Sequence, residues 1–395
     1  GYTSIFGDYD NDGDLDIYVV NDRGPNVLYQ NNGDGTFTNV SSQAGVADSG
    51  DGRCAVFFDY DKDGFLDIYL TNMGQANRLF QNLGDGTFKD VTTTAGVGNQ
   101  GDTHGVCVGD FDNDGDSDIY VVNFRGQPSV YYRNQGDGTF VEATAEAGLE
   151  SIGWGVNANA GDYDNDGDLD IYLVNELNGQ NRFFQNQGDG TFEEIAEALG
   201  LDSSEMGRIG MFEDFDMDGD LDIYLTNNGP NRLFRNNGDG SFIDVASVAG
   251  VDNSGNSCGL AFADYDNDGD QDIYIINWKD RSNVLYQNNG NANHWLKIRV
   301  IGTISNQEGI GAKIIVTAGG KSQMREVGWN TGHFSQSSRW VVFGLGMETQ
   351  VDSIIVHWPS GVIQDTTDVL ANQVLIMKEP LPQHDVALES IMVPE

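Results

Sequence analysis

The sequence predicts an all-β protein that consists of a β-propeller with six repeat-encoded blades, followed by a small β-sandwich. Three observations predict it. A nine-residue acidic loop recurs six times, about every 50 residues; each period holds four short apolar runs; and the acidic loops vanish in the last quarter of the chain. A fixed period of this length indicates one supersecondary unit copied around an axis or along an array. Four strands per unit describe a propeller blade, whereas a linear solenoid has shorter repeats.

The four apolar runs of each period occur in one order. In the first period, TSIF precedes the acidic loop, IYVV follows it directly, and VLYQN comes next. The fourth strand opens with GDGTF or GDGSF, in which Asp-Gly between apolar runs is a hairpin signal. This signature starts at Gly33, Gly84, Gly136, Gly188 and Gly238.

The sixth period lacks that signature, because NNGNANHWLKIRV stands in its place. The fourth strand of the last blade must therefore come from upstream of Gly1, from the HWLKIRV segment, or not at all. A seventh blade is possible if upstream residues were removed. Gly1 falls almost on a strand, which indicates a processed or trimmed start, and no signal peptide is visible.

The first acidic loop, DYDNDGDLD, has the donor set of a calcium site. Asp8, Asp10 and Asp12 occupy positions 1, 3 and 5, and Asp16 occupies position 9. Calcium takes six to eight oxygen ligands, and an EF-hand would need a Glu at position 12, where this chain has apolar residues. Gly13 permits the sharp turn. Position 7 is Phe in the second copy, so we expect this position to bind through its backbone carbonyl.

Six copies with the same four Asp positions make a merely solvated acidic turn a remote alternative. We therefore expect about six calcium ions, one per loop, with structural rather than catalytic roles. The predicted ligand positions are Asp8, Asp10, Asp12, Asp14 and Asp16; Asp59, Asp61, Asp63, Phe65 and Asp67; Asp110, Asp112, Asp114, Asp116 and Asp118; Asp162, Asp164, Asp166, Asp168 and Asp170; Asp214, Asp216, Asp218, Asp220 and Asp222; and Asp264, Asp266, Asp268, Asp270 and Asp272.

An aromatic residue always fills loop position 2, and we expect it to pack between adjacent blades. These residues are Tyr9, Tyr60, Phe111, Tyr163, Phe215 and Tyr265. The three cysteines, Cys54, Cys107 and Cys258, favour buried thiols, with a Cys54–Cys107 bridge between neighbouring units as the alternative.

The formal net charge of −42 restricts the partners. Even six bound divalent ions would leave the chain strongly negative, which argues against nucleic acids and anionic membrane surfaces. No apolar run reaches the 18 residues of a membrane span. The charge suits a protein in calcium-rich surroundings outside the cell, and the aromatic content argues against disorder.

Residues 293–379 alternate like the strands of a small β-sandwich, with Gly and Pro-Ser-Gly turns between them. Residues 380–395 are predicted to be a linker and the start of a truncated next module, so further domains of the same chain are expected. The division is therefore 1–292, 293–379 and 380–395.

The acidic loop between two strands of a blade resembles the FG-GAP or VCBS repeat of integrin-like propellers, over residues 1 to about 292. This resemblance implies calcium at the loop positions given above. The segments NHWLKIRV, GIGAKIIVTAGGK, FGLG and VDSIIVHWPSG resemble the ASPIC/UnbV domain, which follows such propellers in bacterial proteins similar to cartilage acidic protein. The EGF-like module of the animal relatives is absent here.

No catalytic motif can be identified, and none of the five histidines lies in a nucleophile, zinc or phosphate motif. The residue six places before each loop varies between repeats and starts the strand that lines the propeller channel. Arg53, His104 and Arg208, with Trp154 nearby, could bind an anionic or sugar ligand; the alternative is that they only fill the channel mouth. We expect a secreted or cell-surface adhesion or recognition module that binds a glycan or protein; the alternative is a polysaccharide lyase or hydrolase that uses the propeller face.

Overall fold

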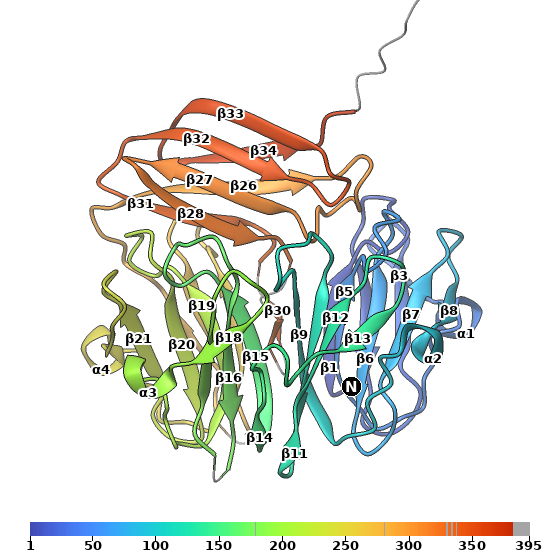
Figure 1. The fold of residues 1–395 in the computed structure, drawn as a ribbon. Coiled ribbons are helices and arrows are strands. Elements are labelled where there is room, and N and C mark those ends of the chain that lie inside the picture. Colours follow the sequence, from blue (N-terminus) through green and yellow to red (C-terminus); the bar gives the residue numbers. More distant parts are fainter. Residues whose placement is uncertain (178, 280, 329–330, 333–334, 337, 382–395) are drawn as a thin grey trace, which may run out of the picture.

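The computed structural model describes residues 1–381 except 178, 280, 329–330, 333–334 and 337; the predicted truncated module therefore lies almost wholly outside the described residues. The all-β prediction is confirmed: successive four-stranded antiparallel sheets form the blades of a β-propeller, and a two-sheet sandwich lies on one of its ends (Figure 1).

Blades 1 to 5 each have four strands. Blade 1 contains β1 (Thr3–Gly7), β2 (Asp16–Val20), β3 (Val27–Asn31) and β4 (Phe37–Asn39). Blade 2 contains β5 (Gly52–Phe58), β6 (Asp67–Asn72), β7 (Arg78–Asn82) and β8 (Phe88–Asp90). Blade 3 contains β9 (Thr103–Gly109), β10 (Asp118–Asn123), β12 (Val130–Asn134) and β13 (Phe140–Glu142), and its loops add the short pair β11 (Gln127–Pro128) and β14 (Ile152–Gly153).

The remaining blades follow the same order. Blade 4 contains β15 (Gly155–Gly161), β16 (Asp170–Asn175), β17 (Arg182–Asn186) and β18 (Phe192–Glu194). Blade 5 contains β19 (Gly207–Glu213), β20 (Asp222–Asn227), β21 (Arg232–Asn236) and β22 (Phe242–Asp244). Blade 6 has three described strands, β23 (Ser257–Ala263), β24 (Asp272–Asn277) and β25 (Val284–Tyr286).

A one-turn helix follows the fourth strand in four of the blades, where the sequence indicated only a turn. The helices are α1 (Ser41–Ala44), α2 (Thr92–Ala95), α3 (Ala196–Leu199) and α4 (Ala246–Ala249). Each ends at a glycine in the left-handed conformation, such as Gly45 with φ 82°, because this backbone geometry carries no steric penalty in glycine.

The propeller core lies between blades rather than within them. Five clusters of buried side chains each join two successive blades, from blades 1 and 2 to blades 5 and 6. The position-2 aromatics contribute as predicted: Tyr9 packs on Phe88 of the next blade with ring centroids 5.7 Å apart, and Tyr60 packs on Phe140 at 6.0 Å. Thus each acidic loop is anchored to the neighbouring blade.

The sandwich contains two sheets of order β31-β26-β34 and β28-β27-β32-β33 around one core cluster. Its strands are β26 (His294–Ile301), β27 (Lys313–Ala318), β28 (Lys321–Glu326), β31 (Val341–Gly346), β32 (Gln350–His357), β33 (Ile363–Leu370) and β34 (Gln373–Lys378). The HWLKIRV segment forms β26, which pairs with β31 and β34. It therefore does not supply the fourth strand of blade 6.

A short hairpin of the sandwich reaches down to the inner strands of the propeller (Figure 1). It consists of β29 (Thr331–Gly332) and β30 (Ser335–Gln336). Gln336 accepts the backbone N–H of Phe6 in blade 1 at 2.8 Å and donates to the Phe6 carbonyl at 3.3 Å. Ser338 donates its backbone N–H to the Phe262 carbonyl of blade 6 at 3.2 Å. The hairpin therefore connects the first and last blades.

The cysteines decide one smaller expectation. All three cysteines are free thiols, so the alternative Cys54–Cys107 bridge is not formed. Among the described residues, no helix is long and apolar enough to span a membrane.

Candidate metal centres in the acidic loops

Each acidic loop joins the innermost strand of a blade to the second strand. In blade 1, β1 ends at Gly7 and β2 begins at Asp16, and these two residues are paired across the sheet. The strand pairing thus fixes both ends of the loop. At position 4, a residue with a positive φ turns the chain in every loop; these are Asn11, Lys62, Asn113, Asn165, Met217 and Asn267.

The loop backbone is held by its own carboxylates. Asp8 accepts the N–H groups of Asp12 and Gly13 at 3.0 and 2.9 Å. Asp16 accepts the N–H groups of Tyr9 and Asn31 at 3.2 and 2.8 Å. Each carboxylate has about four lone-pair sites, so these bonds orient the carboxylates and leave acceptor capacity for a ligand.

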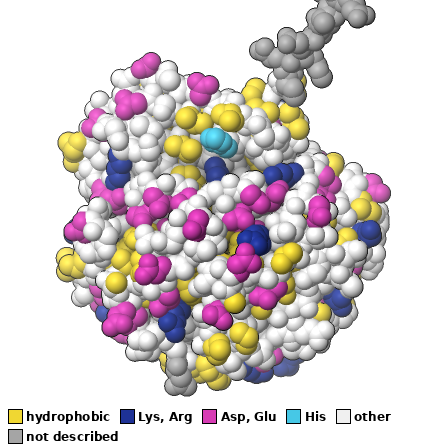
Figure 2. Space-filling model, viewed as in Figure 1, with side chains coloured by type: hydrophobic (Ala, Val, Ile, Leu, Met, Phe, Trp, Pro, Cys, Tyr) yellow, Lys and Arg dark blue, Asp and Glu magenta, His cyan; other side chains and the backbone are white. Residues whose placement is uncertain are grey.

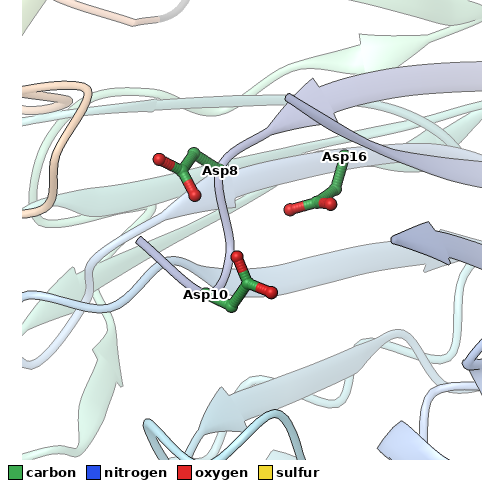
Figure 3. Close-up of side chains that lie close together, drawn as sticks. All are labelled: Asp8, Asp10 and Asp16. Atoms are coloured by element: carbon green, nitrogen blue, oxygen red, sulfur yellow. The ribbon is translucent and has the colours of Figure 1, made fainter. Parts of the chain in front are cut away.

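The carboxylates of one loop converge on a common point. Oxygen atoms of Asp8, Asp10 and Asp16 lie within 4.8 Å of one another, and Figure 3 shows the three side chains around one space. The second loop gathers the same three positions, and loops 3 to 5 gather positions 1, 3 and 5. The other groups of this kind include Asp59, Asp61 and Asp67; Asp110, Asp112 and Asp114; Asp162, Asp164 and Asp166; and Asp214, Asp216 and Asp218.

The carboxylate at position 3 gives the most specific indication of a bound cation. One oxygen of Asp10 accepts a hydrogen bond from Gln30 at 2.7 Å, and the other is buried without a hydrogen-bond partner. Asp61 repeats this arrangement with Gln81. A buried oxygen without a partner costs free energy, and a hard cation in the cluster would remove that cost. The residues therefore fit a calcium ion by donor type and by this unsatisfied oxygen.

The position-7 carboxylates point to the neighbouring loop. Asp168 accepts a hydrogen bond from Asn113 of the previous blade at 2.6 Å, and Asp220 accepts one from Asn165 at 2.8 Å. In the second loop, where position 7 is Phe65, Asn11 donates to the backbone carbonyl of Gly64 instead. This contact between position 4 of one loop and position 7 of the next was not predicted, because nothing in a single repeat indicates which blade its side chains contact.

Burial opposes ionisation of the loop carboxylates when no cation is bound. It raises the pKa of Asp8 to about 6 and the pKa values of Asp59, Asp162 and Asp214 to about 7. At position 9, burial holds the pKa values of Asp67, Asp118, Asp170 and Asp222 well above the usual range. The charged form therefore needs a compensating positive charge.

The sandwich supplies some positive charge to the same loops. Lys297 pairs with Asp264 at 2.9 Å, Lys313 with Asp110 at 2.8 Å and Lys321 with Asp220 at 2.8 Å. Figure 2 shows basic side chains along the boundary between sandwich and propeller, beside many acidic ones. Sequence reasoning missed these residues, because their alternation within strands only indicated a sandwich.

The residues predicted to bind an anionic or sugar ligand lie at the other ends of the inner strands, away from the acidic loops. Two of them, Arg53 and Arg208, already form ion pairs. Arg53 pairs with Asp51 at 3.1 Å and lies over the ring of Tyr2. Arg208 pairs with Glu176 at 2.7 Å. These contacts fix the two guanidinium groups near the starts of β5 and β19.

His104 lies in an aromatic stack at the same end. It stacks on Phe124 with ring centroids 4.2 Å apart, and Trp154 meets the edge of Phe124. Burial, with the nearby Arg53, lowers the pKa of His104 to about 3. The imidazole is therefore neutral at physiological pH.

The fold and the loops define a class of protein. It is a β-propeller built from sequence repeats, and the repeats carry Asp clusters that can hold a metal ion. The chain belongs to the FG-GAP-like repeat family, whose model matches residues 8–70, 59–121, 110–173, 162–210 and 214–275. The model for ASPIC and UnbV matches residues 302–383.

The chain is similar to cartilage acidic protein 1. It is 32% identical to the human protein over 169 residues, which are 40% of this chain and 25% of that protein. Identity to the Xenopus tropicalis protein is 33% over 169 residues, or 40% of this chain and 26% of that protein. The chain thus covers about a quarter of these curated relatives. The names of these families and relatives include no enzymatic activity.

Two of the solved structures that the comparison found have low sequence identity to this chain. An Agrocybe aegerita lectin that recognises non-reducing terminal N-acetylglucosamine is 20% identical with a TM-score of 0.47, over 73% of this chain and 77% of the lectin. The V. cholerae biofilm matrix protein Bap1 is 12% identical with a TM-score of 0.41, over 93% of this chain and 58% of Bap1.

Proposed function

We propose that the protein is an extracellular calcium-binding module for adhesion or recognition, in which one structural calcium ion per loop holds each blade. The observation that supports this is the recurring carboxylate cluster with a buried oxygen of Asp10 or Asp61 left without a hydrogen-bond partner. A bound ion would neutralise carboxylates that the strands and the neighbouring blade force together. Extracellular calcium sites have dissociation constants of about 10⁻⁴–10⁻³ M, which suits the proposed location.

The metal content tests this proposal. After dialysis against low calcium and titration back, metal analysis by mass spectrometry should give about six calcium ions per chain. The same titration with magnesium should give weaker binding, since magnesium demands stricter octahedral geometry. Two or fewer calcium ions per chain would contradict the proposal.

We further propose that the propeller end opposite the sandwich binds a glycan or protein ligand. The support is that Arg53 and Arg208 both lie near His104, which stacks on Phe124, and that Trp154 contacts the same Phe124; each arginine is ion-paired in the free chain, so a ligand would compete with or extend these pairs. Binding to a glycan array should fall in Trp154→Ala and Arg208→Ala, and it should persist in Arg23→Ala, in an exposed loop at the same end. Equal binding by all variants would move the ligand site elsewhere.

The alternative, a polysaccharide-acting enzyme, finds less support at this end. His104 is buried against Phe124 and its pKa is lowered to about 3, so it is a weak base at neutral pH. A lyase and hydrolase assay on acidic polysaccharides distinguishes the two functions, and turnover would favour the enzyme.

A further inference from the structure

The sandwich contacts the position-1 carboxylates of the acidic loops unequally. In the third loop, the Lys313 ammonium lies 2.8 Å from a carboxylate oxygen of Asp110. In the sixth loop, the Lys297 ammonium lies 2.9 Å from Asp264. In the second loop, Asp59 accepts only backbone N–H groups among the described residues, and the charges that act on it are the carboxylates of its own loop. The same motif therefore occurs with and without a basic side chain on this carboxylate.

In the third loop, the lysine occupies one oxygen of the carboxylate and leaves the other. Oδ2 of Asp110 accepts hydrogen bonds from Lys313 at 2.8 Å and from the backbone N–H of Gly115 at 3.1 Å. Oδ1 of Asp110 is buried and has no hydrogen-bond partner in the described part of the chain. Oxygen atoms of Asp110, Asp112 and Asp114 still converge within 4.8 Å of one another. A calcium ion in this cluster would therefore share one carboxylate with an ammonium group.

The docked sandwich positions both ammonium groups. Lys313 is the first residue of β27, which pairs with β28 and β32, and its ammonium also donates to Oδ1 of Asn113 in the same loop at 2.8 Å. Lys297 lies within β26, and its ammonium lies 5.6 Å from the ring centroid of Trp340. Each lysine thus has a second contact besides the carboxylate, so its charge is held at position 1 of the loop.

The lysines at position 1 are more buried than the sandwich lysine at position 7. The side chains of Lys297 and Lys313 are 9% and 18% exposed. Lys321, which pairs with Asp220 at position 7 of the fifth loop, is 40% exposed. Charges interact more strongly where less water screens them. Repulsion between a lysine and an ion in the same loop should therefore be strong at position 1 and weak at position 7.

We propose that Lys313 and Lys297 lower the calcium affinity of the third and sixth loops by acting as built-in cations, so that one chain holds two classes of calcium site. The inference rests on the proposed calcium sites and assigns them different affinities. Calcium affinity depends on the charge of the ligand set, and each lysine cancels one negative charge of its loop. At low calcium the lysines compensate part of the carboxylate repulsion in these two loops, whereas the second loop binds its ion first.

Calorimetric titration of the calcium-free full chain tests this proposal. The native chain should show two classes of site whose dissociation constants differ at least about tenfold. Lys313→Met removes the charge and keeps a long unbranched side chain, so one ion should move from the weaker class to the tighter one. In calcium-free buffer this variant should unfold at a lower urea concentration than the native chain, and saturating calcium should reduce the difference because the variant binds its ion more tightly.

Further variants separate the charge of the lysine from its packing and its position. Lys313→Arg keeps the charge and should retain the weak site. Lys321→Met removes a lysine of the same sandwich at position 7 and should leave every dissociation constant within about twofold of the native value. Addition of Asp114→Ala to Lys313→Met should abolish the tightened site, which locates it in the third loop. Lys297→Met should tighten the sixth loop in the same way, and it provides a second test if Lys313→Met does not fold.

The outcomes separate this inference from the proposed function. Sites of one affinity in the native chain, or unchanged affinities in Lys313→Met and Lys297→Met, would overturn the inference and leave the calcium function intact. Weaker calcium binding by these variants would show that the lysines orient the carboxylates for the ion, and would also overturn it. Two or fewer ions in the native chain would contradict the proposed function, and the inference with it.

Discussion

Blades 2 and 6 carry the same acidic motif in different surroundings. Their acidic loops read DYDKDGFLD and DYDNDGDQD. In blade 2 every residue of β6 is buried and Tyr60 is 4% exposed. In blade 6, Tyr265 is 50% exposed and Tyr274 of β24 is 40% exposed. The motif therefore sets the geometry of the loop, whereas the neighbouring blades set how strongly the loop is desolvated.

This difference affects the pKa values that the loop carboxylates have in the absence of a cation. Burial holds the pKa of Asp67 in blade 2 well above its usual range. Burial also raises the pKa of the equivalent Asp272 in blade 6, but the described part of the chain places no fourth strand beside β25. We infer that the interior loops pay the larger desolvation cost without a cation, so their blades should depend more strongly on calcium.

The largest expected effect is that of calcium removal. At calcium about 100-fold above the dissociation constant, each independent site contributes about 2.7 kcal/mol, and several such sites together approach the roughly 5–15 kcal/mol of a whole domain. Chelation should lower the melting temperature by more than about 10 °C and expose the interblade aromatics. Scanning calorimetry with tyrosine fluorescence measures both changes. An unchanged melting curve would show that the loops do not stabilise the blades.

A second prediction concerns pH in calcium-free buffer. Burial raises the folded-state pKa values of Asp59, Asp162 and Asp214 to about 7, above the roughly 3.9 of a free Asp. The folded chain thus holds these protons more tightly than the unfolded chain, so their contribution to stability is complete below pH about 4 and is lost as pH rises through about 7.

Urea unfolding at several pH values should therefore show falling stability between these limits. Saturating calcium should remove this loss, because the ion binds the ionised carboxylates and its stabilisation grows over the same window. A calcium-free stability that rises with pH across this window would contradict the assigned burial of the loops.

A third experiment tests whether the ion pair between the sandwich and blade 6 stabilises the folded chain. The side chains of Lys297 and Asp264 are 9% and 3% exposed, and loss of one partner of a buried pair costs about 3–5 kcal/mol. Lys297→Ala should therefore lower the free energy of unfolding by about 3 kcal/mol. The control is Lys62→Ala, whose side chain is 33% exposed in its pair with Asp116 and should cost at most about 1 kcal/mol. Equal losses would show that the interface is not desolvated.

The smallest expected effects on calcium binding and stability distinguish position 5 from position 7 of the fourth loop. Asp166→Ala removes a carboxylate of the cluster, so calorimetric titration should show one calcium ion fewer and a loss of about 2.7 kcal/mol at 100-fold excess. Asp168→Ala keeps the backbone carbonyl and loses only the contact with Asn113, so all ions should bind. If both variants lose one ion, position 7 binds through its side chain.

The repeat architecture was predictable because it depends on local patterns. Period, strand runs and GDG turns specify each blade, and the position-2 aromatics specify its contact with the next one. The partners of Asn113 and Asn11 were not predictable, since they depend on the relative rotation of adjacent blades. The same holds for Lys297 and Lys313, whose side chains reach the loops only because the sandwich lies over that end of the propeller.

The predicted ligand residues illustrate a second limit of the sequence. Counting from the loops correctly places Arg53 and Arg208 at the ends of the inner strands. It gives no information on Glu176, which follows the second strand of the preceding blade and pairs with Arg208. The sequence shows that a charged side chain stands at a position. It does not show whether a partner that is distant in the sequence neutralises that charge.

The hairpin contact of Gln336 with Phe6 and of Ser338 with Phe262 has a consequence for unfolding. In a linear array each repeat touches only its neighbours, so the terminal repeats fray independently. Here the hairpin contacts both blade 1 and blade 6, so neither blade can open before the hairpin detaches. The six repeats and the sandwich should then unfold together as one cooperative unit, and detachment of the hairpin should be its first step.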